Sequence, residues 1–269
     1  MRERPWRAKP RTQRRHGRRP AGARPLARHG ERRDADAPVV LYGWHTVTAA
    51  LANPARRIRR MWATENAARR LADEGVALPA ETEMVRPDLI AARLSPDAVH
   101  QGLLAEADPL PAPDLDDLTA GIVLVLDQIT DPHNVGAILR TAAAFAVAAI
   151  VTTARHSPEA TGVLAKSASG ALEWVPIVSV QNLARAIAAL KERHFQIVGL
   201  DSGGIEDLAA IKLSAPLALV LGAEGKGLRQ GTRAVCDVLA RLDLPGAIKS
   251  LNVSNAAALS LYIASQALR

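Results

Sequence analysis

The sequence predicts an α/β protein built on a parallel sheet, and three observations indicate that class. In the second half of the chain, short apolar runs alternate with helix-like segments, the runs lack the polar alternation of half-exposed strands, and small or polar residues follow them. A parallel sheet covered by helices on both faces has this pattern. With 269 residues and 48% apolar content, the chain can fill the core of one large domain or two modest ones.

Composition narrows the cellular setting. The single cysteine, Cys236, allows no disulfide within the chain and no cysteine-based zinc cluster, so we expect no metal site. No apolar run approaches the ~20 residues that span a bilayer, and the N-terminus lacks the apolar core of a secretory signal. We therefore expect a soluble, cytoplasmic protein with no membrane partner.

Residues 1–37 are predicted to form a disordered basic tail. They hold 13 lysine and arginine residues against 4 aspartate and glutamate residues, whereas the rest of the chain holds 21 against 23. Such an arginine-rich segment with several prolines cannot bury enough apolar surface to fold alone. The favoured interpretation is a phosphate-binding arm for RNA. A solubilising tail and an organellar targeting peptide are the alternatives, and the four acidic residues disfavour the second.

Residues 38–107 are predicted to form a small mixed domain, with a linker at 108–120. The predicted elements are a helix ending near Ala52, a strand at 58–63, a helix ending at Leu71, a helix starting at Pro87 and a strand at 102–105. Residues 108–117 contain three prolines and four acidic residues, which is too stiff and polar for a core element.

Residues 121–269 are predicted to contain the parallel sheet. The predicted strands are 122–126, 148–151, 195–200, 217–221 and 238–244, and the predicted helices are 134–145, 183–193 and 253–268. Because parallel strands end at the same edge of a sheet, the loops after them are expected to meet there and to hold the ligand site.

The first of these loops, residues 127–136, opens the helix that carries Asn134 and Arg140. The two residues are less than two helical turns apart, and we expect their side chains to flank one mouth. The alternative makes Asn134 a helix cap and Arg140 a surface ion-pair residue.

The second loop, residues 222–227, is rich in glycine. It is neither a Walker loop nor the dinucleotide-binding fingerprint, because the required lysine and glycine spacings are missing. Its glycines are expected to let the backbone approach a flat ligand or adopt positive φ. Glu224 is expected to take a polar role in the site, with a solvated turn carboxylate as the alternative.

The third loop carries Ser250, Asn252 and Ser254 just before a helix. By itself this is an N-cap cluster.

Taken in this order, the three loops resemble the SpoU/TrmH family of S-adenosylmethionine-dependent RNA 2′-O-ribose methyltransferases. The matching residues are Asp131-Pro-His-Asn-Val-Gly136 with Arg140, Leu219-Val-Leu-Gly-Ala-Glu-Gly225 with Gly227, and Leu244-Pro-Gly with Ser250-Leu-Asn-Val-Ser254. The likeness spans residues 122–269. The departure is Asn255, where an apolar residue is common, and we expect it to affect helix packing rather than chemistry.

The first half also resembles a domain of that family. The segment from Tyr42-Gly-Trp-His45 through His100-Gln-Gly102 is similar to the small substrate-binding domain that many members carry. The combination most resembles the branch that methylates guanosine ribose in 23S rRNA.

The resemblance implies a fold that sequence patterns alone would never suggest, a deep trefoil knot near the C-terminus. It also implies a homodimer, an S-adenosyl-L-methionine cofactor and a ribosomal RNA substrate. The positions it assigns to the cofactor are Gly222, Leu242 and Leu251, and those it assigns to the catalytic surround are Asn134, Arg140, Glu224, Ser250 and Asn252.

Methyl transfer to a ribose needs alignment of the reactants and removal of the hydroxyl proton. His133 is expected to be a turn residue rather than a base. Arg140 is expected to hold the RNA phosphate beside the target ribose and to favour the developing alkoxide, since its guanidinium stays protonated in proteins. The sequence leaves the phosphate, water and a transiently neutral Arg140 open as the base.

Three other functions remain as alternatives. The same reaction on tRNA is close, although the separate first domain disfavours it. A non-catalytic RNA-binding assembly factor is disfavoured by the presence of Arg140, Glu224 and Asn252. A nucleotide-dependent oxidoreductase or NTPase is the weakest, because the fingerprints of both classes are missing.

Overall fold

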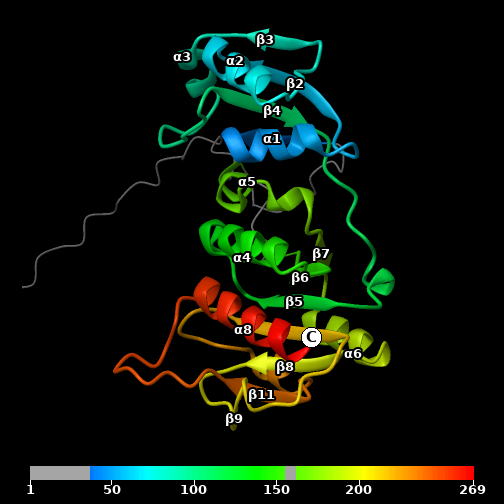
Figure 1. Cartoon of the computed structure of the whole chain (residues 1–269). Helices are drawn as coiled ribbons and strands as arrows, with labels where there is room; N and C mark the ends of the chain where they lie inside the picture. Colours follow the sequence, from blue (N-terminus) through cyan, green and yellow to red (C-terminus); the bar gives the residue numbers. More distant parts are fainter. Residues whose placement is uncertain (1–36, 155–161) are drawn as a thin grey trace, which may run out of the picture. The chain divides into compact units, whose positions relative to one another are not determined.

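The structure, a computed structural model, describes residues 37–154 and 162–269. The predicted basic tail, apart from Ala37, lies outside the described residues. The described part of the chain contains two sheets that come one after the other in sequence (Figure 1).

The first sheet has four strands in the order β1-β4-β2-β3. β4 pairs antiparallel with β1 and β2, and β2 pairs parallel with β3. The elements are β1 (Val39–Tyr42), α1 (Trp44–Ala52), β2 (Ile58–Ala63), α2 (Glu65–Asp73), β3 (Thr82–Met84), α3 (Pro87–Ala91) and β4 (Leu103–Ala107). β2 has the predicted bounds, whereas the short strands β1 and β3 were not predicted.

The second sheet has seven strands in the order β7-β6-β5-β10-β8-β11-β9, and all its strand pairs are parallel. Its strands are β5 (Ile122–Asp127), β6 (Ala149–Thr153), β7 (Ile177–Val180), β8 (Gln196–Leu200), β9 (Glu206–Asp207), β10 (Leu217–Gly222) and β11 (Val238–Arg241). The helices of this half are α4 (Pro132–Ala144), α5 (Gly162–Ala168), α6 (Leu183–Glu192), α7 (Gln230–Arg233) and α8 (Val253–Ala267). The predicted parallel α/β class is confirmed.

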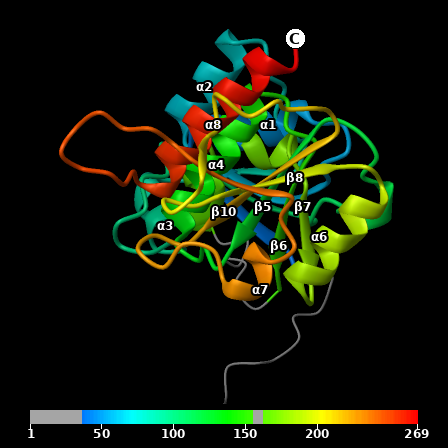
Figure 2. The same ribbon diagram turned by 90° about the horizontal axis from the view of Figure 1, so that it is seen from below.

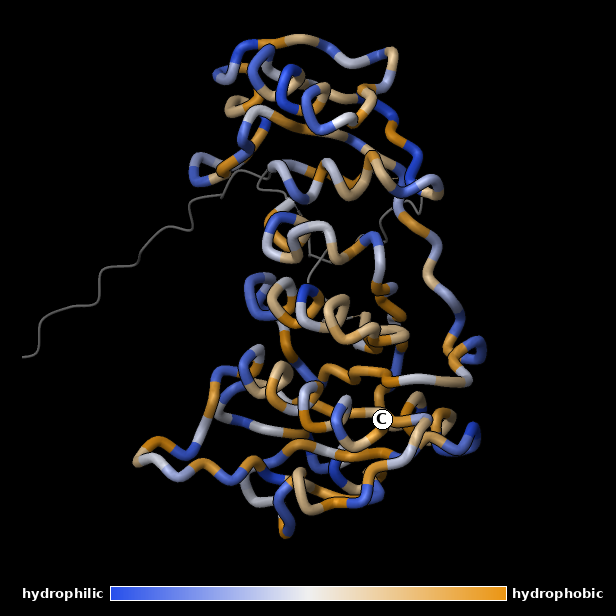
Figure 3. Tube along the Cα trace, viewed as in Figure 1, coloured by the Kyte–Doolittle hydropathy of each residue, from blue (hydrophilic) through white to orange (hydrophobic). Residues whose placement is uncertain are grey.

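Both faces of this sheet are buried, because alternate residues of its central strands face opposite sides. Leu124 and Leu126 of β5 join a cluster with α4 and α8, whereas Val123 and Val125 join a second cluster with α6. Figure 3 shows the hydrophobic colour concentrated along these strands. The strands therefore read as unbroken apolar runs in the sequence.

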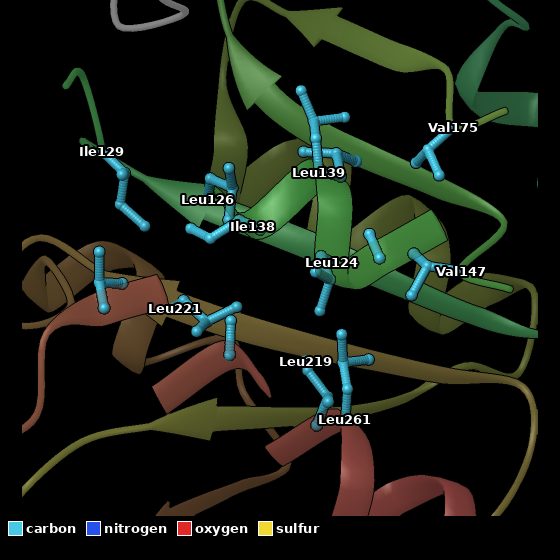
Figure 4. Close-up of a cluster of buried hydrophobic side chains, with 14 of the residues drawn as sticks. Leu124, Leu126, Ile129, Ile138, Leu139, Val147, Val175, Leu219, Leu221 and Leu261 are labelled. Atoms are coloured by element: carbon cyan, nitrogen blue, oxygen red, sulfur yellow. The ribbon is translucent and has the colours of Figure 1, made fainter. Parts of the chain in front are cut away.

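The C-terminal helix α8 packs back onto the centre of the sheet. Its residues Val253, Ala257, Leu261 and Ala264 are buried, and their spacing of three or four residues keeps them on one stripe. Figure 4 shows Leu261 beside Leu219 of β10 within the first cluster. The start of α8, with the third predicted loop before it, is thereby held against the sheet.

The first half contacts the second through α5 and the 3₁₀ turn η2 (Ala171–Glu173). Ala165 of α5 belongs to the buried cluster of the first sheet. Arg56 forms an ion pair with Glu173 at 2.8 Å, with only 4% and 2% of the two side chains exposed, and donates to the carbonyl of Asp108 at 2.7 Å. Breaking a buried pair on one side is costly, so these contacts fix where the linker begins.

The predicted linker contains one short element, the 3₁₀ turn η1 (Leu115–Asp117), which is capped by Asp114. In the described part of the chain, no helix has the length and apolar character required to cross a membrane.

Candidate functional site

The ends of β5, β8 and β10 lie side by side at one edge of the parallel sheet. Gly222, the last residue of β10, is the register partner of Asp127, the last residue of β5. Leu221 pairs with Leu200, the last residue of β8. The first and second predicted loops therefore start from adjacent points, at the edge where open α/β sheets bind ligands.

The glycine-rich loop after β10 folds back on itself. The Gly227 amide donates to the carbonyl of Ala223 at 2.8 Å, and Gly225 and Gly227 have φ of 72° and 64°. A Cβ on Gly222 would lie 2.2 Å from the carbonyl carbon of Gly227, so only glycine fits there. Glu224 is exposed within this turn.

A buried carboxylate, Asp127, binds the chain just after the same loop. It accepts hydrogen bonds from the backbone nitrogen of Arg229 at 3.0 Å and from its Nε at 2.6 Å. Asp127 is fully buried, and an unpaired charge would be expensive there. Sequence reasoning missed this pair, although an acid that ends an otherwise apolar strand was an available signal.

The first and third loops are joined by two asparagines. The side-chain amide of Asn252 donates to Asn134 Oδ1 at 3.0 Å. Asn252 is also the N-cap of α8, where its Oδ1 accepts from the backbone nitrogen of Ser254 at 2.8 Å and from its hydroxyl at 2.6 Å. Asn134 is not a cap, because Asp131 caps α4 by accepting from the His133 amide.

Arg140 lies on a different face of α4 from Asn134. Six residues of helix place Arg140 about 120° from Asn134 around the axis, whereas the seven residues from His133 complete almost two full turns and leave the two about 20° apart. His133 contacts the hydroxyl of Ser167 in α5 at 3.3 Å, and α4 lies between α5 and α8 (Figure 1). That Asn134 and Arg140 flank one mouth stays a prediction, since the two side chains leave different faces of the helix. Arg140 is exposed.

The third loop, between β11 and α8, carries the remaining predicted residues. Leu242 is half-buried against the core cluster, Ser250 is exposed, and Leu251 keeps 36% of its surface exposed. The backbone of residues 245–251 makes no hydrogen bond to another described residue. Figure 2 shows this orange-to-red segment projecting from the rest of the ribbon. Its backbone donors and acceptors are thus open to a ligand.

Within the same described part of the chain, no group of three His, Cys, Asp or Glu side chains is placed to hold a metal ion. The polar groups at the sheet edge include amides, hydroxyls, arginines, the paired carboxylates of Asp127 and Asp201, and the exposed Glu224.

Comparison with protein families places both halves of the chain. A family described as the SpoU rRNA Methylase family matches residues 121–262. The chain belongs to the SpoU rRNA methylase family. A second family, described as RNA 2′-O ribose methyltransferase substrate binding, matches residues 40–113.

Relatives of this SpoU family member extend over both halves. The chain is 38% identical to the 23S rRNA (guanosine-2′-O-)-methyltransferase RlmB of Pseudomonas putida over 82% of this chain and 94% of the relative. It is 39% identical to the enzyme of the same name from Vibrio cholerae over 83% of this chain and 94% of the relative.

Solved structures share the fold. An AdoMet-bound rRNA methyltransferase from Sinorhizobium meliloti matches with a TM-score of 0.73 at 22% identity, covering 87% of this chain and 88% of that one. The SpoU methyltransferase AviRb from Streptomyces viridochromogenes, in complex with AdoMet, matches with a TM-score of 0.71 at 23% identity, covering 86% and 90%.

Proposed function

We propose that this chain transfers the methyl group of S-adenosyl-L-methionine to the 2′-hydroxyl of a guanosine in 23S rRNA. The observation that carries the proposal is the Asn252–Asn134 hydrogen bond, which joins the first and third loops at the sheet edge where the glycine-rich loop begins. Relatives named for this reaction are 38% and 39% identical along both halves, which supports the substrate.

The residues at this edge fit the cofactor. Leu242 and Leu251 offer apolar surface for a flat adenine, and residues 245–251 offer backbone groups without partners among the described residues. Gly222 has no side chain, which lets the backbone of Gly227 pack directly against it at the end of β10. When bound, S-adenosyl-L-methionine supplies a methyl group already activated by its sulfonium.

The remaining residues act on the RNA. Asn134 and Asn252 orient polar groups of the target nucleotide, and Ser250 and Glu224, which are both exposed, provide further acceptors. Arg140 holds the RNA phosphate and stabilises the negative charge that develops on the ribose oxygen. As that oxygen gains the methyl group, its proton leaves to solvent.

We also propose a homodimer in which one chain supplies Arg140 to the loops of the other. The different flanks of Asn134 and Arg140 on α4 support this arrangement, and the exposed Leu259 and Tyr262 of α8 offer apolar surface for the contact. Mixing an Arg140→Ala chain with an Asn252→Ala chain tests it. Mixed dimers would regain one intact site and about a quarter of wild-type activity in total, whereas a site within one chain would regain none.

The finer organisation is proposed to match that of the family. We assign RNA binding to residues 38–107, the linker to 108–120 and methyl transfer to 121–269. We propose a trefoil knot in the last segment, supported by the central place of β10 between β5 and β8 and by the return of α8 onto α4. The cytoplasm, where ribosomal RNA is found, is the proposed location, and the basic tail is proposed to be a disordered RNA-binding arm.

The decisive experiment incubates the full chain with methyl-labelled cofactor and unmodified 23S rRNA or tRNA, and then maps the labelled nucleotide. Label on a 23S guanosine ribose is expected, and label on tRNA alone would overturn the substrate. Arg140→Ala should lose at least about 100-fold in turnover while keeping its affinity for the cofactor. The control is Lys212→Ala, an exposed cation at the opposite edge of the sheet, which should leave turnover unchanged.

A further inference from the structure

The first half of the chain contains a hollow of about 230 Å³, well removed in sequence from the three loops. It lies among the start of α1, the first two turns of α2 and the turn before β4. Its lining residues are Trp44, Thr64, Asn66, Ala67, Arg70, Pro87, His100, Gln101 and Gly102. We name it the Trp44 hollow. Ligand sites for drug-sized molecules span ~300–1,000 Å³, so its size suits a smaller group.

The turn that forms one wall is rigidly built. Gln101 adopts φ of 53°, and its Oε1 accepts from the backbone nitrogen of Trp44 at 2.9 Å and from Lys166 Nζ at 2.9 Å. Gly102 has φ of 82°, and a Cβ there would lie 2.4 Å from the hydroxyl of Thr64. A non-glycine residue at positive φ is uncommon and is held only where its surroundings fix it.

Arg70 presents a flat cation at this hollow. Its guanidinium carbon lies 3.7 Å from the centre of the Trp44 ring, and Nε donates to Glu74 at 3.0 Å. Trp44 is 4% exposed, whereas the Arg70 side chain is 56% exposed. One face of the Arg70 guanidinium therefore covers the indole of Trp44. The hydrogen bond to Glu74 holds the guanidinium in place, and its opposite face is exposed to solvent.

His100 adds a neutral polar group. Its Nδ1 accepts from the Gly102 amide at 3.0 Å, which leaves the ring proton on Nε2 as a donor. Burial lowers the pKa of His100, so the ring stays neutral at physiological pH. Asn66, exposed at the rim, offers both an amide donor and a carbonyl acceptor. These groups match the edge of a heterocycle.

We propose that the Trp44 hollow receives one unstacked nucleobase of the RNA substrate, stacked on the Arg70 plane and bonded at its edge by Asn66 and His100. The proposal rests on the proposed function and deepens it by naming the contact that the first half makes. RNA-binding proteins hold splayed bases in this way, on aromatic or guanidinium planes.

A phosphate is the weaker occupant. Among the described lining residues, Arg70 alone carries a full positive charge, and it is already paired with Glu74. His100 is neutral, and much of the lining is the apolar surface of Trp44, Ala67 and Pro87. Phosphate sites instead gather several cations or backbone amides.

The test compares Arg70→Lys with the matched control Arg69→Lys. Both positions are exposed on α2, and both variants keep the charge, but only Arg70 lines the hollow. For Arg70→Lys, the KM for an unmodified rRNA fragment should rise about tenfold, which is 1.4 kcal/mol. Both kcat and the cofactor Kd should stay unchanged, because the lost contact binds substrate and transition state equally. Arg69→Lys should match the wild type.

RNA fragments with single abasic positions identify the base. One abasic position outside the methylated nucleotide should weaken binding to the wild type and to Arg69→Lys, and should have no further effect on Arg70→Lys. Binding is measured by fluorescence anisotropy, which needs no methyl transfer. The proposal that a base enters the hollow is overturned if the two lysine variants bind rRNA with equal affinity. It is also overturned if the abasic position weakens binding to Arg70→Lys as much as to the wild type.

The two proposals fail separately. If the wild type methylates no rRNA, the proposed function fails, and the binding measurements still decide whether a base enters the hollow. If methylation is normal, Arg70→Lys binds rRNA like the wild type and Arg70→Ala lowers the salt slope of binding by about one, Arg70 contacts a phosphate and the base assignment is overturned.

Discussion

The ion pair between Asp127 and Arg229 is the sharpest quantitative test of how the site is held. Arg229→Ala removes the Nε donor at 2.6 Å from a fully buried carboxylate and leaves the backbone hydrogen bond at 3.0 Å as its one donor among the described residues. The glycine-rich loop ends at this point of the chain. The substitution should therefore lower both the stability of the fold and the affinity of the site for its cofactor.

The magnitude depends on the exposure of the two partners. Breaking a fully buried pair costs about 3–5 kcal/mol, and losing one hydrogen bond to a charged group costs about 1.5–3 kcal/mol. The Arg229 side chain is 41% exposed, so water reaches it and screens the pair. We expect a loss of about 2 kcal/mol in the free energy of unfolding, which corresponds to a fall of about 4–8 °C in Tm.

A double-mutant cycle in urea measures the coupling directly. The variants are Arg229→Ala, Asp127→Asn and the two combined, with Arg185→Ala as the control for loss of an exposed cation on α6. The control should change stability by less than about 0.5 kcal/mol. A coupling energy of at least about 1 kcal/mol between the two positions is expected. A value within about 0.5 kcal/mol of zero would refute the role given to this pair.

Three further predictions concern other parts of the chain. Gly222→Ala should abolish cofactor binding measured by calorimetry, because the new Cβ would lie 2.2 Å from the backbone of Gly227; binding within a few-fold of wild type would contradict the closed turn. Burial, with a smaller contribution from Asp237, raises the pKa of the Cys236 thiol from 9.0 to about 11, so alkylation at pH 8 should be roughly 100-fold slower than in the urea-unfolded chain. Because the folded-state pKa is the higher one, the stability linked to this thiol is complete below pH 9 and is lost as pH rises through 11. Deletion of residues 1–37 should weaken rRNA binding and flatten its salt dependence, and a filter-binding slope equal to that of the full chain would rule out the arm.

The class of the second half could be predicted because its strands are buried on both faces. Residues 122–126 and 217–221 show unbroken apolar runs, and the structure places them as adjacent parallel strands. The short strands β1, β3 and β9 could not be predicted, since two to four residues give too little periodicity to distinguish a strand from a loop.

The site could be predicted only in part for a related reason. Asn252 and Asn134 are 118 residues apart in sequence, and only their loop motifs indicated that they belong together. No motif marks the Asp127–Arg229 pair, which spans 102 residues and combines a strand end with a loop residue. Side-chain pairs of this kind depend on strand order, which local patterns do not contain.

The helix geometry of α4 bears directly on the proposed dimer. Sequence proximity suggested that Asn134 and Arg140 share a mouth, and six residues at 3.6 per turn place them about 120° apart around the helix axis. Asn134 accepts a hydrogen bond from Asn252, just before α8. Arg140 lies on the same side of α4 as His133 and Gly136, which contact Ser167 of α5. We propose that the arginine serving these loops comes from a second chain. The proposed dimer supplies it, and that makes methyl transfer depend on protein concentration at the dilution where the dimer separates.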